Sequence, residues 1–506
     1  MRANTVVAAL AAVAFLIACR EPTPSPTPTQ PSYALGAPTA CPANPTVVVS
    51  DEASLYDALR DAQQGETIAV NGFFDAGDAI IHTDHVTLTC ATPGSGLRGR
   101  PVGLIVRVYA RGVTVSDLVL DATSSLEGAY LAFFDGVTAF GEDIQFLRNT
   151  VTCGATNKCV FFGSESHAAA HGGLVADNYV AAAGAKFGGV TIQGVSGARI
   201  ERNTIVATAP SAKGILANGD ESIVVSDNVV SGPWAVSLAF DAGVFHSSVE
   251  RNRLEGAVDD GADLFFVDGL RFLSNEVSCG SGACIFMNSG PGALIADNRF
   301  ESAGSGTGVQ LQNGIDGTRV ERNTIIATAR STVNFLGAIR VRDGSDVVVA
   351  DNVVVGPWIN SVAPTSLVRS RFEGNDLEGA QRYGIRMSAV FAGVPPPMTN
   401  NLFRSNRITA AATAGILGHL ACANQFIGNN LQGNAGNMGA IFDETTGANI
   451  LAGNMNIVID DGLGDCNGDG VADVGGNIIT GRGLVLRGMP FSPPPSDAAA
   501  TSSRFQ

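Results

Sequence analysis

The sequence predicts an all-β solenoid in which each coil takes about 25 residues and contains about three short strands. Two repeated features indicate this fold. An asparagine recurs about every 25 residues with apolar residues on both sides, and a second apolar segment that follows a glycine lies upstream of each asparagine. The composition agrees, because only 15% of the residues are charged and 61 of 506 are glycine, which is unlike a helical protein.

The recurring asparagines share one local setting, as in the segments ARIERNTIVA and TRVERNTIIA. The series comprises Asn149, Asn178, Asn203, Asn228, Asn252, Asn275, Asn298, Asn323, Asn352, Asn375, Asn406, Asn429, Asn454 and Asn477. Alternation before the asparagine predicts a strand, with Ala198 and Ile200 on one side of it. Ile205 falls out of this phase, so we expect the chain to bend at the asparagine, a residue that tolerates the positive φ of a tight bend.

The glycine-led segments have the form GGVTIQG, KGILANG, TGVQLQNG, GAIRVRDG and YGIRMS. Over residues 46–486, these repeats resemble the right-handed parallel β-helix of the pectate-lyase-like superfamily. The resemblance implies coils about 4.8 Å apart and a ladder of stacked asparagine amides at the sharp turn. A left-handed β-helix would need hexapeptide spacing and a leucine-rich solenoid a leucine consensus, and the sequence shows neither.

A short helix is predicted before the first coil. Leu55, Ala58, Leu59 and Ala62 have helical spacing, Asp51 or Ser50 would cap the helix, and Gly65 would end it. This helix looks like the cap that closes the first coil in the superfamily.

A longer repeat spans five coils, with units at about residues 149–252 and 275–375. The segment Asp227–Trp234 recurs as Asp351–Trp358. We interpret this as a tandem duplication, which favours a long regular surface over one unique pocket. Trp234 and Trp358 each follow a proline; they could be exposed sugar-stacking platforms, and packing against neighbouring loops is the simpler interpretation.

The first 45 residues predict export and anchoring. Residues 1–18 have the charge and apolar segment of a signal peptide, and Leu16-Ile17-Ala18-Cys19 resembles the lipobox of bacterial lipoproteins, in which Cys19 is lipidated. Residues 19–45 are a Pro/Thr-rich tether, and residues 487–506 read as disordered. Arg20 after the cysteine favours the outer membrane or cell surface. A net charge of −16 without a basic cluster excludes nucleic acid as a partner.

Eight cysteines remain after Cys19, and an even number in an exported chain favours disulfides. Cys153 and Cys279 lie five coils apart, which is too far for a disulfide bond. Cys153–Cys159 and Cys279–Cys284 should therefore each close a local loop. Cys41–Cys90 would fix the tether to the first coils. Cys422–Cys466 follows by exclusion and requires a loop excursion.

A calcium site is a further candidate. Asp465, Asn467, Asp469, Val471 and Asp473 follow the spacing of an EF-hand-type loop, with Val471 offering its carbonyl. Position 12 is Gly476 rather than glutamate, so binding would be weak, and a turn without an ion is the alternative. No other cofactor is expected.

The sheet of glycine-led strands is the face that relatives of this fold use most. Alternation predicts that six polar side chains point outward from it: Gln310, Gln312, Arg340, Arg342, Arg386 and His419. Arginine and glutamine suit the carboxylates and hydroxyls of an acidic glycan. The alternative is a solvated face with ion pairs to Asp343 and Asp346.

The family's catalytic motifs are mostly missing. Asp259-Asp260 and Asp460-Asp461 are paired aspartates, but the Gly-His-Gly and Arg-Ile-Lys motifs of polygalacturonases and the calcium centre of pectate lyases are not recognisable. The first hypothesis is therefore a lipid-anchored, monomeric protein that binds a polysaccharide or cell-wall component. The alternatives are a polysaccharide lyase or glycoside hydrolase, and a structural or adhesive spacer.

Overall fold

The chain divides into two units, residues 1–36 and residues 37–506. The computed structural model describes residues 41–125, 128–133, 142–155, 158–163, 170–241, 243–303, 306–331, 337–388, 398–443, 445–454, 457–462, 464, 466, 472, 474–480 and 485–487. All of them lie in the second unit. Cys19, the tether before residue 41, the five calcium-loop residues and the tail after residue 487 lie outside the described residues, so those interpretations stay predictions.

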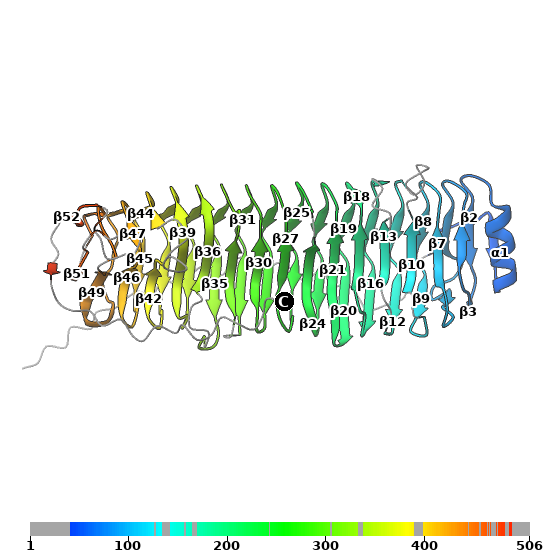
Figure 1. Cartoon of the computed structure of the whole chain (residues 1–506). Helices are drawn as coiled ribbons and strands as arrows, with labels where there is room; N and C mark the ends of the chain where they lie inside the picture. Colours follow the sequence, from blue (N-terminus) through cyan, green and yellow to red (C-terminus); the bar gives the residue numbers. More distant parts are fainter. Residues whose placement is uncertain are drawn as a thin grey trace, which may run out of the picture. The chain divides into compact units, whose positions relative to one another are not determined.

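The second unit is an all-β solenoid whose successive coils stack in chain order, as predicted (Figure 1). The strand pairings within its three sheets are parallel, and all but two keep one register along their length. The exceptions are the pairings of residues 179–183 with 204–209 and of residues 438–442 with 457–460. Each coil contributes a strand to each of the three sheets along most of the chain. The predicted three strands per coil are therefore confirmed.

The first sheet carries the strand that precedes each recurring asparagine from Asn149 to Asn454. Its strands are β1 (Val47–Val49), β2 (Thr67–Val70), β5 (Thr87–Cys90), β8 (Thr114–Ser116), β11 (Gln145–Leu147), β15 (Leu174–Ala176), β19 (Arg199–Glu201), β22 (Val224–Ser226), β25 (Ser248–Glu250), β28 (Arg271–Leu273), β31 (Leu294–Ala296), β34 (Arg319–Glu321), β37 (Val348–Ala350), β40 (Arg371–Glu373), β44 (Leu402–Arg404), β48 (Gln425–Ile427), β50 (Ile450–Ala452) and β52 (Ile478–Thr480).

The second sheet carries the strand that follows these asparagines as far as Asn406. Its strands are β3 (Phe73–Asp75), β6 (Gly96–Arg98), β9 (Val119–Ala122), β12 (Thr150–Cys153), β16 (Tyr179–Ala183), β20 (Thr204–Ala209), β23 (Val229–Ser231), β26 (Arg253–Leu254), β29 (Glu276–Cys279), β32 (Arg299–Ser302), β35 (Thr324–Ala327), β38 (Val353–Val355), β41 (Asp376–Glu378) and β45 (Arg407–Thr409).

The third sheet contains the glycine-led segments. Its strands are β4 (Ala79–Ile81), β7 (Leu104–Val108), β10 (Gly128–Phe133), β13 (Lys158–Gly163), β17 (Gly188–Gln193), β21 (Ser211–Asn218), β24 (Trp234–Asp241), β27 (Ala262–Phe265), β30 (Ala283–Asn288), β33 (Thr307–Gln312), β36 (Gly337–Ser345), β39 (Asn360–Val368), β42 (Tyr383–Arg386), β43 (Met398–Thr399), β46 (Ala414–Gly418), β47 (Ala421–Cys422), β49 (Met438–Phe442), β51 (Ile457–Asp460) and β53 (Val485–Arg487). A small pair, β14 (Ala170–His171) and β18 (Val195–Ser196), and a 3₁₀ turn, η1 (Ala435–Asn437), complete the described elements.

Glycine is required near the start of strands in the third sheet, where the chain lies close to core side chains of the second sheet. A Cβ added at Gly308 would lie 2.3 Å from Cγ2 of Ile325, and one added at Gly384 would lie 2.0 Å from Cγ2 of Ile408. These isoleucines are buried core residues of the second sheet. Only glycine lets the two sheets approach this closely.

The core lies between the three sheets and consists of matching positions in successive coils. On the first sheet, the rings of Phe372 and Phe403 stack with centroids 4.7 Å apart, and those of Phe403 and Phe426 stack 4.9 Å apart. Each of these rings is fully buried. Similar side chains therefore pack against each other in successive coils. For this reason, the spacing of apolar residues in the sequence equals the number of residues in a coil.

The predicted helix is present as α1 (Glu52–Asp61), at the start of the first coil. The Asp51 carboxylate accepts the Ser54 backbone N–H at 2.8 Å, and the Ser54 hydroxyl oxygen accepts the Asp51 N–H at 3.3 Å. This reciprocal capping fixes the helix start, while Leu55 and Leu59 bury the inner side. No helix among the described residues is both long and apolar enough to cross a membrane.

The asparagine ladder is continuous from Asn149 to Asn454. Asn228 is typical: its Nδ2 donates to Oδ1 of Asn252 at 3.0 Å, and its Oδ1 accepts the Asn203 backbone N–H and Nδ2, each at 2.9 Å. These side chains are almost completely buried at most positions. The ladder inferred from the resemblance is therefore present over thirteen of the fourteen predicted positions.

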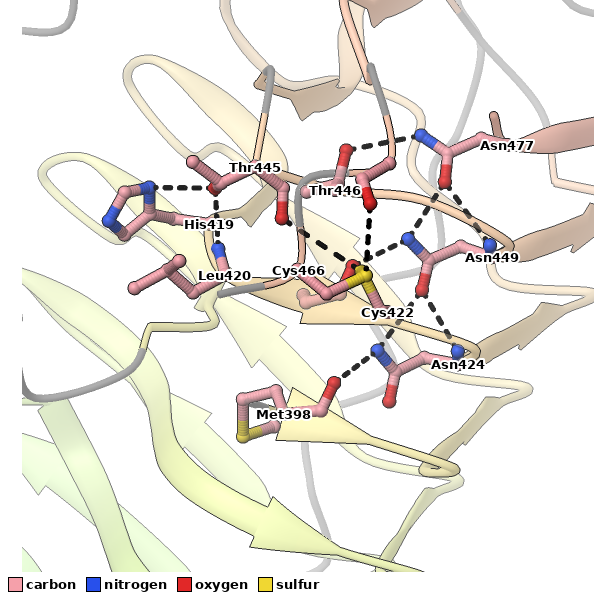
Figure 2. Close-up of a disulfide and its surroundings, with 12 residues drawn as sticks. Met398, His419, Leu420, Cys422, Asn424, Thr445, Thr446, Asn449, Cys466 and Asn477 are labelled. Carbon is pink, nitrogen blue, oxygen red and sulfur yellow. Dashed lines mark hydrogen bonds between the residues drawn. A yellow bond between two sulfur atoms is a disulfide. The ribbon is translucent and has the colours of Figure 1, made fainter. Parts of the chain in front are cut away.

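Asn477 is the exception, because it belongs to a second ladder. There the amides of Asn401, Asn424, Asn449 and Asn477 bond in succession, as Figure 2 shows for the last three. Each of the first three lies five residues before a member of the first ladder. A period of about 25 residues fits both turn positions equally, so spacing alone could not separate them.

The positive φ angles correct a second expectation. They belong to the residue before the ladder asparagine, for example Arg202 with φ 54° and Asp227 with φ 58°. None of the ladder asparagines has a positive φ. The preceding residue makes the bend, and the asparagine then directs its amide into the turn, where it bonds to neighbouring coils.

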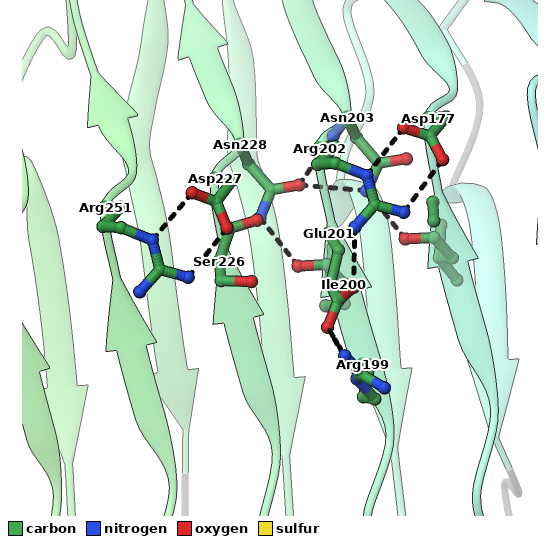
Figure 3. Close-up of polar contacts among 12 residues, drawn as sticks. Asp177, Arg199, Ile200, Glu201, Arg202, Asn203, Ser226, Asp227, Asn228 and Arg251 are labelled. Carbon is green, nitrogen blue, oxygen red and sulfur yellow. Dashed lines mark hydrogen bonds and ion pairs between the residues drawn. The ribbon is translucent and has the colours of Figure 1, made fainter. Parts of the chain in front are cut away.

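The bend residues often carry opposite charges in successive coils. Arg202 donates two hydrogen bonds to Asp177, at 2.8 and 2.9 Å, and Arg251 makes the same pair of contacts with Asp227 (Figure 3). Arg202 also contacts Glu201, which is buried beneath the arginines. The positive and negative side chains at the outer edge of this turn therefore neutralise each other's charge.

Three of the four predicted disulfides are present: Cys41–Cys90, Cys279–Cys284 and Cys422–Cys466. Cys153 and Cys159 are both buried, and their pairing stays a prediction. The three bonds are typical of a protein outside the reducing cytoplasm.

Candidate functional site

The candidate site lies on the outer face of the third sheet. Val309, Ile339 and Val362 occupy matching inward positions and are fully buried. Their neighbours one residue later therefore point outward. Because the strands are parallel and in register, these outward side chains form rows that cross the sheet, with steps of about 4.8 Å. We call this surface the outer face.

Four of the six predicted residues are direct neighbours there. Gln310 on β33 pairs with Arg340 on β36, and Gln312 pairs with Arg342 two residues further on. Arg386 continues the row of Gln310 and Arg340 beyond Ala363, because Val362 pairs with Ile385. The structure therefore brings five predicted residues onto neighbouring strands, β33 to β42.

His419 lies further along the solenoid, just after β46. Its Nδ1 is 2.6 Å from Oδ2 of Asp443. It shares the outer face with the arginines and belongs to a different group of contacts.

Arg340 differs electrostatically from most arginines of the chain. Arg342 pairs with Asp343 at 2.6 Å, and Asp346 pairs with Arg369 at 2.8 Å. Within the described part of the chain, the Arg340 side chain makes no hydrogen bond or ion pair, although it is half-buried. Burial lowers its pKa, and the charge of Arg342 lowers it further, while Asp343 acts in the opposite sense. The predicted local ion pair thus forms for Arg342, whereas Arg340 has no counter-ion among the described residues.

Three polar residues beside this group were missed by the sequence analysis. Thr307, Asn360 and Tyr383 are buried at the strand starts, in one row with Gly337. The Thr307 hydroxyl and both amide atoms of Asn360 have no hydrogen-bond partner among the described residues. A Cβ at Gly337 would lie 3.2 Å from Ala363, so this row also belongs to the outer face. No sequence signal marks it, because the strand bends after it and breaks the alternation.

An acidic group precedes the arginines along the same face. Lys213 Nζ lies 2.6 Å from Oδ2 of Asp241. Burial raises the pKa of Asp263 to about 7, and the charges of Asp260 and Asp241 add to the effect. Oδ1 of Asp263 is buried without a hydrogen-bond partner among the described residues.

Two aromatic rings adjoin the acidic group. Asp263 pairs across the sheet with Phe286, and the rings of Phe265 and Phe286 lie 5.6 Å apart. Both are half-buried. In contrast, Trp234 and Trp358 are at most 1% exposed. The simpler interpretation of the tryptophans, packing in equivalent turns, is correct, and neither is a stacking platform.

The paired aspartates have a structural role here. Oδ1 of Asp259 accepts the Ser281 hydroxyl at 3.1 Å, and Asp260 accepts the Ala283 N–H. These bonds fix the next coil's turn. No cluster of three or more His, Cys, Asp or Glu in the described ranges is arranged to hold a metal ion.

Comparison with known proteins supports the architecture. Residues 167–325 match the family model described as a right handed beta helix region. No curated protein sequence matches the chain.

Solved structures with a related fold include a glucanase, a polysaccharide lyase and a surface adhesin. The catalytic unit of a GH87 alpha-1,3-glucanase from Streptomyces thermodiastaticus strain HF3-3 shares 14% identity over 83% of this chain and 70% of that chain, with a TM-score of 0.42. A mannuronic acid specific polysaccharide family 6 lyase from human gut microbiota shares 10% over 71% and 87%, with a TM-score of 0.40. PfbA, a surface adhesin of Streptococcus pneumoniae, shares 10% over 78% and 90%, with a TM-score of 0.33. Such distant likenesses, spread over different activities, leave function to the residues of this chain.

Proposed function

We propose that the protein binds an acidic polysaccharide along the outer face of the third sheet, with Arg340 at the centre of the site. The observation that carries the proposal is the half-buried Arg340 guanidinium, which has no counter-ion among the described residues. Removing a cation from water without pairing it costs several kcal/mol. An anionic group of a ligand would offset this cost, because a guanidinium can bind a carboxylate through two parallel hydrogen bonds.

The neighbours of Arg340 suit an extended ligand. Gln310 and Gln312 offer amide donors and acceptors beside the two arginines, and Arg386 lies two strands beyond Arg340. Repetition at strand spacing supplies contacts to successive sugars of a chain rather than to one small molecule. The acidic group around Asp241 would repel a polyanion, so we expect binding to be strongest from β33 to β42.

The test is binding of the full chain to a panel of acidic and neutral polysaccharides, measured by calorimetry. Arg340→Gln should lower the affinity for the acidic glycan about 10- to 100-fold, the value of a charge-assisted contact of about 1.5–3 kcal/mol. Wild-type affinity should also fall with added salt. The unfolding midpoint should stay unchanged or rise, because the variant loses a desolvated charge.

Arg371→Gln is the matched control. Arg371 is exposed on β40 of the first sheet, away from the outer face, and its loss should leave affinity unchanged. Arg199 is unsuitable because it pairs with buried Glu201. Equal affinity of wild type and Arg340→Gln for the glycan would contradict the site. Absence of binding across the whole panel would favour a structural or adhesive spacer.

The proposal includes a lipid anchor at Cys19, which the lipobox sequence supports. Cys19→Ser should release the protein in soluble form from the membrane fraction. A variant that stays with membranes after alkaline washing would contradict the anchor. The same sequence features support an outer-membrane or cell-surface location.

Calcium binding by Asp465, Asn467, Asp469, Val471 and Asp473 is proposed on their spacing alone, and calorimetry with Ca²⁺ tests it.

Glycoside hydrolysis is the second candidate function, and Asp263 favours it. A carboxyl group whose pKa is about 7 can donate a proton at neutral pH, while the nearby Asp241 carboxylate can assist as a base or nucleophile. Release of reducing ends from the polysaccharide panel tests this function. Asp263→Asn should abolish release if it occurs there, and unchanged release would place the chemistry elsewhere.

A further inference from the structure

His419 and Asp443 form a tightly held pair at the far end of the outer face. Nδ1 of His419 lies 2.6 Å from Oδ2 of Asp443, and the Thr445 hydroxyl donates to Oδ1 of the same carboxylate at 2.6 Å. The Leu420 N–H in turn donates to the Thr445 hydroxyl oxygen at 2.7 Å. An ionised carboxylate only accepts hydrogen bonds, so Nδ1 carries the hydrogen and Nε2 is left as a base.

Ser388 lies on the other side of His419. Arg386 pairs with Leu417, and the Met387 N–H donates to the Leu417 carbonyl at 2.9 Å. Continued two residues beyond this last pair of β42 and β46, the register places Ser388 opposite His419. Gly418 pairs with Phe442, which aligns His419 with Asp443. Ser388, His419 and Asp443 therefore occupy one outward row on three successive coils.

The orientation of the imidazole fits this order. Nδ1 faces Asp443 on one neighbouring coil, Nε2 lies on the other edge of the ring, and the register places Ser388 on the opposite neighbouring coil. Figure 2 shows one ring nitrogen of His419 toward Thr445 and the other directed away from it. The Ser388 hydroxyl now lies 3.4 Å from that of Thr365, and a rotation about χ1 would turn it toward His419 across a step of about 4.8 Å.

The group is accessible to a ligand. The His419 side chain is 43% exposed and Ser388 is half-buried. Ser388 also continues the row of Arg342 and Thr365, since Arg342 pairs with Thr365 and Thr365 bridges to Ser388. A chain bound over the arginines would therefore reach it within a few coils.

We propose that Ser388, His419 and Asp443 form a nucleophile, base and orienting carboxylate that hydrolyse O-acyl esters. That the ester is carried by a polysaccharide rests on the proposed function. The motif is defined by the roles and geometry of its groups, so their origin on three coils of a solenoid is no obstacle.

The reaction balances without a cofactor. Oγ of Ser388 attacks the ester carbonyl carbon, and its proton passes to Nε2 of His419. The acyl C–O bond breaks, and the sugar hydroxyl leaves with that proton, which gives an acyl-serine. Water, deprotonated by the same imidazole, attacks the acyl-serine, releases the carboxylic acid and restores Ser388. Arg386, two residues before Ser388 on the same side of the strand, supplies positive charge for the developing oxyanion.

The experiment uses the full chain with a fluorophosphonate probe and with p-nitrophenyl acetate. We expect the probe to label Ser388, as located by peptide mass mapping, and Ser388→Ala to abolish both labelling and turnover. His419→Gln should abolish labelling, while Asp443→Asn should lower kcat by about 10⁴-fold and alter the pH profile. Unfolding midpoints near that of wild type would show that these variants fold.

His246→Gln is the matched control. His246 is an exposed histidine 3.8 Å from Glu221 in the turn after β24, and its loss should change neither readout. Failure of the probe to label Ser388, or ester hydrolysis that survives in folded Ser388→Ala, would overturn the proposal. Neither probe contains a sugar, so this result is independent of glycan binding. Acetate release from an acetylated acidic glycan, compared between wild type and Arg340→Gln, then tests whether the two sites act on one ligand.

Discussion

Removal of one amide from the asparagine ladder should destabilise the solenoid measurably. In Asn228→Ala, Nδ2 would no longer donate to Oδ1 of Asn252, to the Ile200 carbonyl at 2.8 Å or to the Ser226 carbonyl at 3.0 Å. The buried Asn203 N–H would lose its acceptor, Oδ1 of Asn228. All of these groups lie inside the turn, where water cannot replace the lost partner.

The magnitude follows from these bonds. A buried N–H left without an acceptor costs about 1–3 kcal/mol, and each net hydrogen bond lost costs about 1 kcal/mol. Since some carbonyls keep other partners, we expect Asn228→Ala to lower the free energy of unfolding by about 2–4 kcal/mol. The loss arises from unsatisfied polar groups and not from backbone strain, because the bend residue is Asp227.

Urea unfolding followed by circular dichroism provides the measurement. Asn71→Ala is the control, because Asn71 is exposed and its side chain makes one long contact, 3.4 Å to Thr92. It should change the free energy of unfolding by less than about 0.5 kcal/mol. Similar shifts for the two variants, or no shift for Asn228→Ala, would refute the argument that buried amide stacking holds the turn.

Three further predictions follow from other features. Ser274 has φ 54°, so Ser274→Val should destabilise by about 1–2 kcal/mol while Ser274→Gly is tolerated, as thermal unfolding will show. Asp263 has a pKa of about 7 in the folded state against 3.8 in the unfolded state, so its contribution to stability is present below pH 4 and is lost as the pH rises to 7. The unfolding midpoint of Asp263→Asn should therefore rise relative to that of wild type between pH 4 and pH 7. A constant difference between the two midpoints would contradict the pKa shift. The double variant Cys422→Ser, Cys466→Ser opens a loop of 44 residues and should lose up to about 4 kcal/mol on the chain-entropy account, and an unchanged urea midpoint would exclude that role.

The repeat, the coil length, the cap helix and three disulfide pairings could be predicted from the amino-acid sequence alone. These follow from local chemistry that recurs at a fixed period: buried amides at a turn, glycine where two sheets approach, and a reciprocal cap at Asp51. Alternation along the strands also predicted that Gln310 and Arg340 point outward, because alternation holds wherever a strand is straight.

The tertiary structure decided what period and alternation leave open. The two asparagine ladders have the same period, and only their hydrogen-bond partners distinguish them. For this reason, Asn477 was assigned to the wrong ladder. Asn360 was missed because the strand bends before its alternating segment begins. The surroundings of Arg340 and the row from Ser388 to Asp443 depend on which coil lies beside which. Residues more than twenty positions apart become neighbours only when the coils stack in register.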